Sequence, residues 1–161
     1  MTGEKQKMRI VALGGTFEIL HKGHRKLLSK ALQLGDRIVI GLTSDEFVAR
    51  KQKKHAISKY DKRYENLVIF LSNIGMSDRV EIIPLKDPYG PTIDDAKIDG
   101  IVTSRETMKR ALEINNVRAK KKFEPLRIYV VDFMLAKDGL PISVSRILSG
   151  VIDKEGKILE E

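Results

Sequence analysis

The sequence has no cysteine among its 161 residues, so disulfide bonds, thiolate metal sites and a cysteine nucleophile are excluded. It also has no apolar run that approaches the roughly 18 residues needed to span a membrane as a helix. The polar N-terminal stretch, residues 1–8, contains no apolar segment of the kind found in secretory signals. We therefore expect a cytoplasmic protein.

Aromatic and acidic residues are also in short supply. The five phenylalanines and four tyrosines form no ladder of the kind on which RNA-binding sheets stack bases. Lysine and arginine outnumber aspartate and glutamate by 30 to 22, which gives a formal net charge of +8. This excess favours an anionic partner, and on charge alone that partner can be a nucleic acid, a nucleotide or a phosphorylated metabolite.

The chain length and the hydrophobic pattern predict one α/β domain. A chain of 161 residues is long enough for one full core and short for two, and we expect the core to cover residues 8–150, with 151–161 as a polar C-terminal extension. Apolar strand patterns alternate with helical ones. The expected strands are 9–13, 37–42, 80–85, 100–103 and 126–131, and the expected helices are 24–34, 58–75, 106–121 and 143–148.

This alternation is typical of a Rossmann-like, doubly wound parallel sheet with helices on both faces, and we expect the strand order 3-2-1-4-5. Ligands of such sheets bind beyond the carboxyl ends of the strands. Individual residues also predict where helices and strands begin and end. Gly35 is expected to end the first long helix in a left-handed conformation, Ser58 to Asp61 to form a capping box, and Pro84 to break the third strand.

Two short motifs follow the first expected strand and lead into the first helix: Gly14-Gly15-Thr16-Phe17 and His21-Lys22-Gly23-His24. A helix N-terminus presents unpaired N–H groups and a partial positive charge, which suit an anion. Neither the Walker A pattern nor the dinucleotide fingerprint is present. The motifs therefore predict a phosphate-handling site of a different kind.

The paired histidines do not by themselves predict a metal site. Zinc would require a third ligand, and the only other histidine, His55, lies in a basic loop. We therefore expect no metal held by protein side chains.

Two further segments carry groups that suit phosphate. Residues 142–147 place two hydroxyls and a guanidinium at a helix start, namely Ser143, Ser145 and Arg146. The basic run of residues 50–55 follows the second strand, so a lysine from it can reach over bound phosphates. The spacing does not decide between Lys51, Lys53 and Lys54.

Together, these motifs resemble the HxGH nucleotidyltransferase superfamily. The middle of the chain, residues 83–91, 102–107 and 114–118, is similar to the archaeal and eukaryotic type of pantetheine-phosphate adenylyltransferase. The resemblance covers roughly residues 8–150. It implies that an enzyme of this kind transfers AMP from ATP to 4′-phosphopantetheine by direct in-line displacement, giving dephospho-coenzyme A and pyrophosphate in coenzyme A biosynthesis, with Mg²⁺ accompanying ATP.

The resemblance also implies roles for individual residues. His24, Thr16 and Lys51 would be catalytic: His24 on the α-phosphate, Thr16 on the attacking phosphate and Lys51 as a neutralising charge. Asp87 and Asn115 would lie beside the pantetheine arm. The ATP site would comprise Gly14, Gly15, Thr16, Phe17, His21, Gly23, His24, Arg105, Ser143, Val144, Ser145 and Arg146.

Two alternatives remain open from the sequence. The first is nucleotidyl transfer to another small phosphate, such as glycerol phosphate, FMN or nicotinamide mononucleotide. The second is a non-enzymatic nucleic-acid binder, which the net charge and the basic run of residues 50–55 suggest. The oligomeric state cannot be read from the sequence, and a monomer is compatible with it.

Overall fold

The computed structural model describes residues 8–51, 56–75 and 77–159. Its strands are β1 (Met8–Gly15), β2 (Gly35–Thr43), β3 (Val80–Leu85), β4 (Gly100–Ser104) and β5 (Arg127–Val131). Its helices are α1 (Lys22–Leu34), α2 (Asp45–Arg50), α3 (Tyr60–Asn73), α4 (Met108–Lys120) and α5 (Val144–Leu148), with 3-10 turns η1 (Ser77–Arg79) and η2 (Gly90–Ile93).

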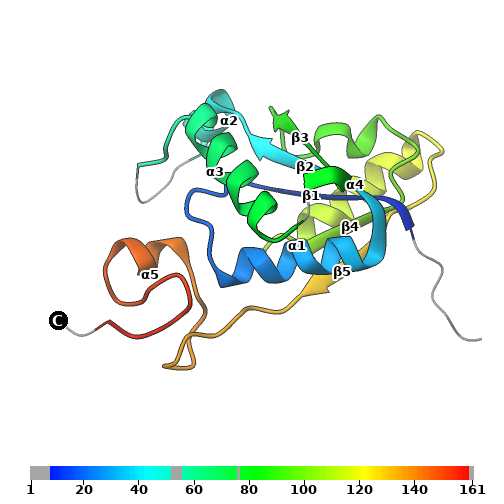
Figure 1. Cartoon of the computed structure of the whole chain (residues 1–161). Helices are drawn as coiled ribbons and strands as arrows, with labels where there is room; N and C mark the ends of the chain where they lie inside the picture. Colours follow the sequence, from blue (N-terminus) through cyan, green and yellow to red (C-terminus); the bar gives the residue numbers. More distant parts are fainter. Residues whose placement is uncertain (1–7, 52–55, 76, 160–161) are drawn as a thin grey trace, which may run out of the picture.

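The five strands form one parallel sheet in the order β3-β2-β1-β4-β5, which confirms the predicted topology. Successive side chains of a strand point to opposite faces. Val11 of β1 accordingly packs with Leu28 of α1 and Leu67 of α3 in one buried cluster, whereas Ala12 packs with Ala111 of α4 in another. The sheet is therefore covered by helices on both faces, as Figure 1 shows.

Two expectations about chain breakers were wrong. Gly35 is not left-handed: it has φ −120° and ψ 153° and opens β2. Glycine is needed there for space, because a Cβ at Gly35 would lie 2.6 Å from Cγ2 of Val11. Pro84 does not break the third strand either. It lies within β3 opposite Leu42, and β3 is an edge strand, where a missing N–H is tolerated.

The start of α3 also differs from expectation, and α3 and α4 each bury an arginine. The predicted capping box is absent, because Lys59 is the N-cap of α3 and its side chain makes no capping hydrogen bond. Instead, the Tyr60 N–H donates to Asp45. Four large apolar residues of α3 and α4 are exposed, namely Tyr64, Val68, Met108 and Leu112. Arg63 and Arg118 are buried instead, and both are used below.

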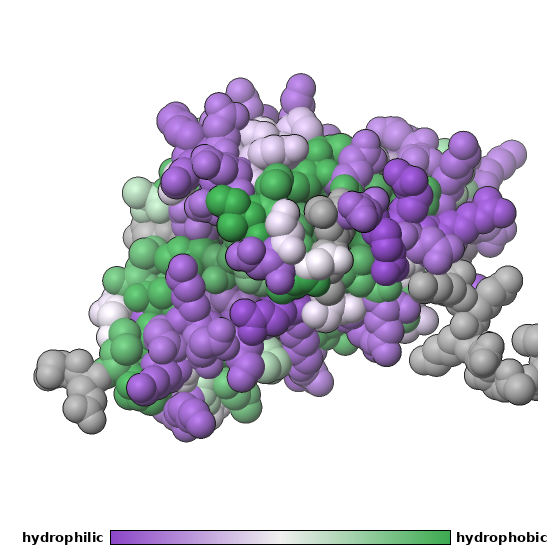
Figure 2. All heavy atoms as spheres, viewed as in Figure 1, coloured by the Kyte–Doolittle hydropathy of each residue, from purple (hydrophilic) through white to green (hydrophobic). Residues whose placement is uncertain are grey.

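Residues 133–159 form a small C-terminal lobe beside the sheet, coloured orange to red in Figure 1. The tail was expected to be a polar extension, but its described part folds back. Ile152 is fully buried against Ala136 and Ile142, and the Lys137 N–H donates to the carbonyl of Gly156. Leu140 and Leu148 of this lobe are exposed, and Figure 2 shows hydrophobic surface among the polar side chains there. Among the described residues, no helix is both long and apolar enough to cross a membrane.

Candidate functional site

One large pocket, of about 610 Å³, opens at the carboxyl ends of the strands. It brings together segments from both ends of the chain, because the glycine–histidine turn after β1 and the start of α5 both line it. The predicted site residues that line it are Gly14, Gly15, Thr16, Phe17, His21, Gly23, His24, Lys51, Ser143 and Val144. The roles assigned to them stay predictions.

The two histidines cap α1 reciprocally. His21 is the N-cap residue, and its Nδ1 accepts the Gly23 N–H at 3.0 Å. Nδ1 of His24 in turn accepts the His21 N–H at 3.1 Å. The imidazole centroids are 4.0 Å apart. This is a capping box in which two imidazoles replace the usual hydroxyl and carboxylate, a substitution that the sequence reasoning missed.

This capping fixes the tautomer of both rings. A backbone N–H only donates, so each Nδ1 must be an acceptor, and the proton of the neutral ring then sits on Nε2. Burial lowers the pKa of His21 to about 4. Burial, followed by the charge of neighbouring His21, lowers the pKa of His24 to about 3. At neutral pH, both rings are therefore uncharged and carry an Nε2–H donor.

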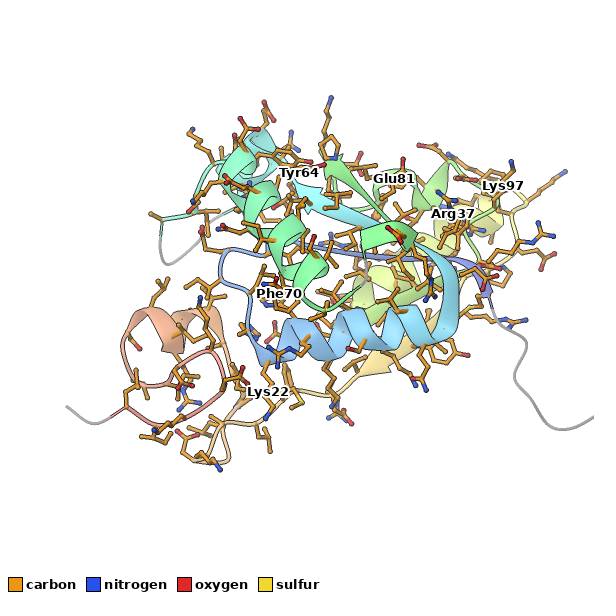
Figure 3. The ribbon with its side chains drawn as sticks, in the orientation of Figure 1. Lys22, Arg37, Tyr64, Phe70, Glu81 and Lys97 are labelled. Atoms are coloured by element: carbon orange, nitrogen blue, oxygen red, sulfur yellow. The ribbon has the colours of Figure 1, made fainter. Side chains whose placement is uncertain are left out.

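The backbone N–H groups at the start of α1 are not free, contrary to expectation. The Lys22 N–H donates to the Lys154 carbonyl at 3.0 Å, and the Gly23 N–H is taken by His21. The N–H groups of His24 and Arg25 both donate to the His21 carbonyl. Figure 3 shows Lys22 next to the folded C-terminal tail. An anion here would therefore be met by imidazole donors and by the field of the helix dipole.

The histidine environment predicts an acid-sensitive fold and two rings that do not titrate near neutrality. The ordinary histidine pKa is about 6.5, so the unfolded chain binds more protons than the folded one below that pH. The free energy of unfolding should therefore fall as the pH drops from about 6.5 towards the folded-state pKa values of about 4 and 3. NMR titration of the imidazoles checks this, and midpoints near 6.5 for His21 and His24 would contradict it.

The turn between β1 and α1 has a strained backbone. Phe17 has φ 50°, a left-handed conformation that is uncommon for a bulky residue. Its ring is buried and lies 5.1 Å from the His24 ring, centroid to centroid. A Cβ at Gly15 would lie 3.2 Å from that ring. Glycine at this position therefore allows Phe17 to pack against His24.

Lys51 is the predicted lysine that the structure places at the pocket. It follows α2, lines the pocket, and its Nζ lies 4.3 Å from the centre of the Phe47 ring. Lys53, Lys54 and His55 lie outside the described residues, so the choice among the three lysines stays open.

The α5 motif reaches the pocket only with its first residues. Ser143 and Val144 line the pocket, and Ser145 and Arg146 do not. Ser143 Oγ caps α5 by accepting the Arg146 N–H at 3.3 Å. The Arg146 guanidinium donates to the Pro141 carbonyl and pairs with Asp138. Arg146 is therefore held within the lobe, and its predicted contact with phosphates stays a prediction.

Three other predicted residues also lie outside the pocket lining. Arg105 pairs with Asp132 at 3.3 Å on the surface. Asp87 accepts the N–H groups of Tyr89 and Gly90, both at 2.8 Å, and so shapes its own loop.

Asn115 is held by the backbone beside β5. Its amide donates to the Leu126 carbonyl at 3.0 Å and accepts the Leu126 N–H at 2.7 Å. Leu126 precedes β5, so this contact lies at the edge of the sheet opposite the pocket. The predicted contacts of Asp87 and Asn115 with an acceptor arm stay predictions.

Sequence reasoning missed the polar network on the α4 side of the pocket. The Tyr89 hydroxyl donates to Glu113 at 3.3 Å, and Arg110 pairs with the same carboxylate at 3.5 Å. All three residues line the pocket. The three-residue spacing of Arg110 and Glu113 on one helical face was a readable signal, but their partner Tyr89 lies in a distant loop.

No group of three or more histidine, aspartate or glutamate side chains suited to a metal ion occurs in the part of the chain that the structure describes. The pocket does contain positive charge from Lys51, Lys109 and Arg110. The same lining contains the carboxylates of Glu18, Glu106, Glu113 and Asp132, so charges of both signs surround the pocket.

The chain resembles known proteins over most of its length. The model of the cytidylyltransferase-like family matches residues 12–150. A phosphopantetheine adenylyltransferase of Methanopyrus kandleri is 49% identical over 92% of this chain and 93% of the relative. The Methanosarcina mazei protein of the same description is 42% identical over 94% of this chain and 97% of the relative. A solved structure from Archaeoglobus fulgidus, described as of unknown function, has a TM-score of 0.69 at 39% identity and covers 78% of this chain and 90% of its own.

Proposed function

Because the chain belongs to the cytidylyltransferase-like family, we propose that it is a nucleotidyltransferase that transfers AMP from ATP to 4′-phosphopantetheine. The products are dephospho-coenzyme A and pyrophosphate, which places the enzyme in coenzyme A biosynthesis. The names of the relatives, phosphopantetheine adenylyltransferases, suggest these substrates. The structural observation that carries the proposal is the convergence of Thr16, His24 and Ser143 on one pocket.

In the proposed reaction, an oxygen of the acceptor phosphate attacks the α-phosphorus of ATP in line, and pyrophosphate leaves with the electrons of the broken P–O bond. Such transfers depend mainly on alignment and on neutralisation of charge. The neutral His24 ring donates its Nε2–H to an α-phosphate oxygen as negative charge accumulates there. Because that ring is already locked by its Nδ1 acceptor bond, little reorganisation is needed during the reaction.

Other residues each contact one of the two substrates. Thr16 holds the attacking phosphate, and His21 and Ser143 face the nucleotide phosphates. Lys51 neutralises charge from the α2 side. Mg²⁺ bound to ATP supplies further charge neutralisation, and we expect phosphates and water to provide its ligands. We also propose that the protein acts in the cytoplasm and does not require nucleic acid or a membrane.

Incubation with ATP, Mg²⁺ and 4′-phosphopantetheine, followed by mass spectrometry, tests the proposal. Dephospho-coenzyme A and pyrophosphate should appear in equal amounts. A panel with glycerol phosphate, FMN and nicotinamide mononucleotide, each with ATP and with CTP, should give far less product. If any of these compounds gave higher turnover than 4′-phosphopantetheine, that compound would be the acceptor substrate instead. Tight, salt-dependent binding of nucleic acid without any product from ATP would favour the binding-protein alternative.

A further inference from the structure

The Arg63 guanidinium is fully buried behind the turn that carries Thr16. Its Nε donates to the Ser58 carbonyl at 2.8 Å. Its Nη1 donates to the Thr16 carbonyl and to Thr43 Oγ1, each at 3.2 Å. Its Nη2 pairs with Asp45 at 3.3 Å. A buried charge is costly unless it is paired and hydrogen-bonded, and here every nitrogen of the guanidinium has a partner.

A second hydrogen bond continues from Thr43 towards the pocket. Arginine can only donate, so the Thr43 oxygen is an acceptor towards Arg63. The hydroxyl of Thr43 in turn donates its single proton to Thr16 Oγ1, at 3.2 Å. Thr16 Oγ1 is thereby an acceptor towards the protein interior, and its own proton remains available to another acceptor.

That proton faces an acceptor outside the protein. Thr16 lines the pocket, and its hydroxyl donates to no other residue within the described ranges. A phosphate oxygen is an acceptor without protons to offer once it is ionised. The polarity of the Arg63–Thr43–Thr16 chain therefore suits an anionic oxygen in this place.

We propose that Arg63 and Thr43 are positioning residues that fix the Thr16 hydroxyl as a donor to the attacking phosphate of the acceptor. The inference rests on the proposed function, because it concerns how that site recognises its second substrate. A donor carrying a full positive charge at the start of the chain polarises the bonds that follow and strengthens each by about 10–30%. The protein thus orients the Thr16 hydroxyl as a hydrogen-bond donor before the acceptor substrate binds.

The Thr43→Val variant tests this chain, because valine keeps the branched shape and removes the hydroxyl. We expect kcat/KM for 4′-phosphopantetheine to fall about tenfold, the effect of about one hydrogen bond, while KM for ATP stays unchanged. Thr43→Ser, which retains the hydroxyl, should recover most of the activity. Ile40→Val is the matched control, since Ile40 is a fully buried residue of the same strand and loses only a methylene group.

A double-mutant cycle separates positioning from general destabilisation. Once Thr16→Val has removed the final donor, adding Thr43→Val should have little further effect on kcat/KM for the acceptor. If Thr43→Val fails to fold, Thr43→Ala takes its place in the same comparison. Equal effects of Thr43→Val and Ile40→Val, or fully additive effects with Thr16→Val, would overturn the inference. Absence of AMP transfer by the unmodified protein would instead refute the proposed function.

Discussion

Replacing His24 with alanine is expected to lower turnover by a factor on the order of 10²–10³, the usual loss when one preorganised donor to transition-state charge is removed. Binding of ATP should weaken much less, because the donor acts most strongly when charge builds on the α-phosphate. Measurement of kcat by pyrophosphate release, alongside the Kd for ATP, checks the prediction. An alanine variant with unchanged turnover would refute the role of His24.

Two further substitutions separate the catalytic role of His24 from its capping role. His24→Gln can place an amide donor near the former Nε2, whereas His24→Asn can place an acceptor near the former Nδ1, which now accepts the His21 N–H. If the Nε2–H is what accelerates the reaction, the Gln variant should be the faster enzyme and the Asn variant the more stable protein. The reverse order of activities would mean that the cap, and not the donor, limits turnover.

Replacing Arg118 with leucine is expected to cost about 4 kcal/mol in the free energy of unfolding. Arg118 is 1% exposed, and it donates to the carbonyls of Thr92, Asp95, Ile98 and Glu124. Each buried acceptor left without a donor costs about 1–3 kcal/mol, and the costs add incompletely. Urea unfolding measures the loss.

Two further arginine variants serve as controls for the unfolding free energy of Arg118→Leu. Arg118→Lys keeps the charge but loses the planar fork of donors, so its stability should fall between those of the leucine variant and the unmodified protein. Arg105→Leu removes an arginine that is exposed, as is its partner Asp132, and should change stability by no more than about 0.5 kcal/mol. A similarly small loss for Arg118→Leu would contradict the structural role of Arg118.

The strand order and the convergence of distant motifs could be predicted because both depend on patterns that a sequence records. Apolar runs such as that before Gly14 mark buried strands, and the alternation with helices restricts the topology. That topology alone places the turn after β1 and the loops that follow the other strands at one edge of the sheet.

The two buried arginines could not be predicted in the same way. In the sequence, Arg63 and Arg118 resemble ordinary charged positions on helices. Backbone carbonyls supply half of the partners of Arg63 and all those of Arg118. A backbone carbonyl is present at every residue, so it leaves no mark in the sequence. The same reason explains Asn115, whose amide is satisfied by the backbone of Leu126.

The backbone conformation of Gly35 and the ion pair of Arg146 show a second kind of feature that the sequence did not predict. Glycine after a helix often means a left-handed cap, but at Gly35 it is the neighbouring Val11 that requires a small residue. Arg146 has the chemistry for phosphate, yet Asp138, eight residues earlier in the chain, pairs with it. In both cases the deciding neighbour is set by packing in three dimensions.

The contacts of Arg118 have an evolutionary consequence. Its four acceptors are main-chain oxygens, so mutations that change the side chains at 92, 95, 98 and 124 leave the acceptors in place. As far as the contacts with Arg118 are concerned, those side chains can change independently, while the arginine itself cannot. Methods that infer proximity from correlated substitutions would therefore find no trace of this cluster, although it holds the wall of the pocket at η2 to the rest of the domain.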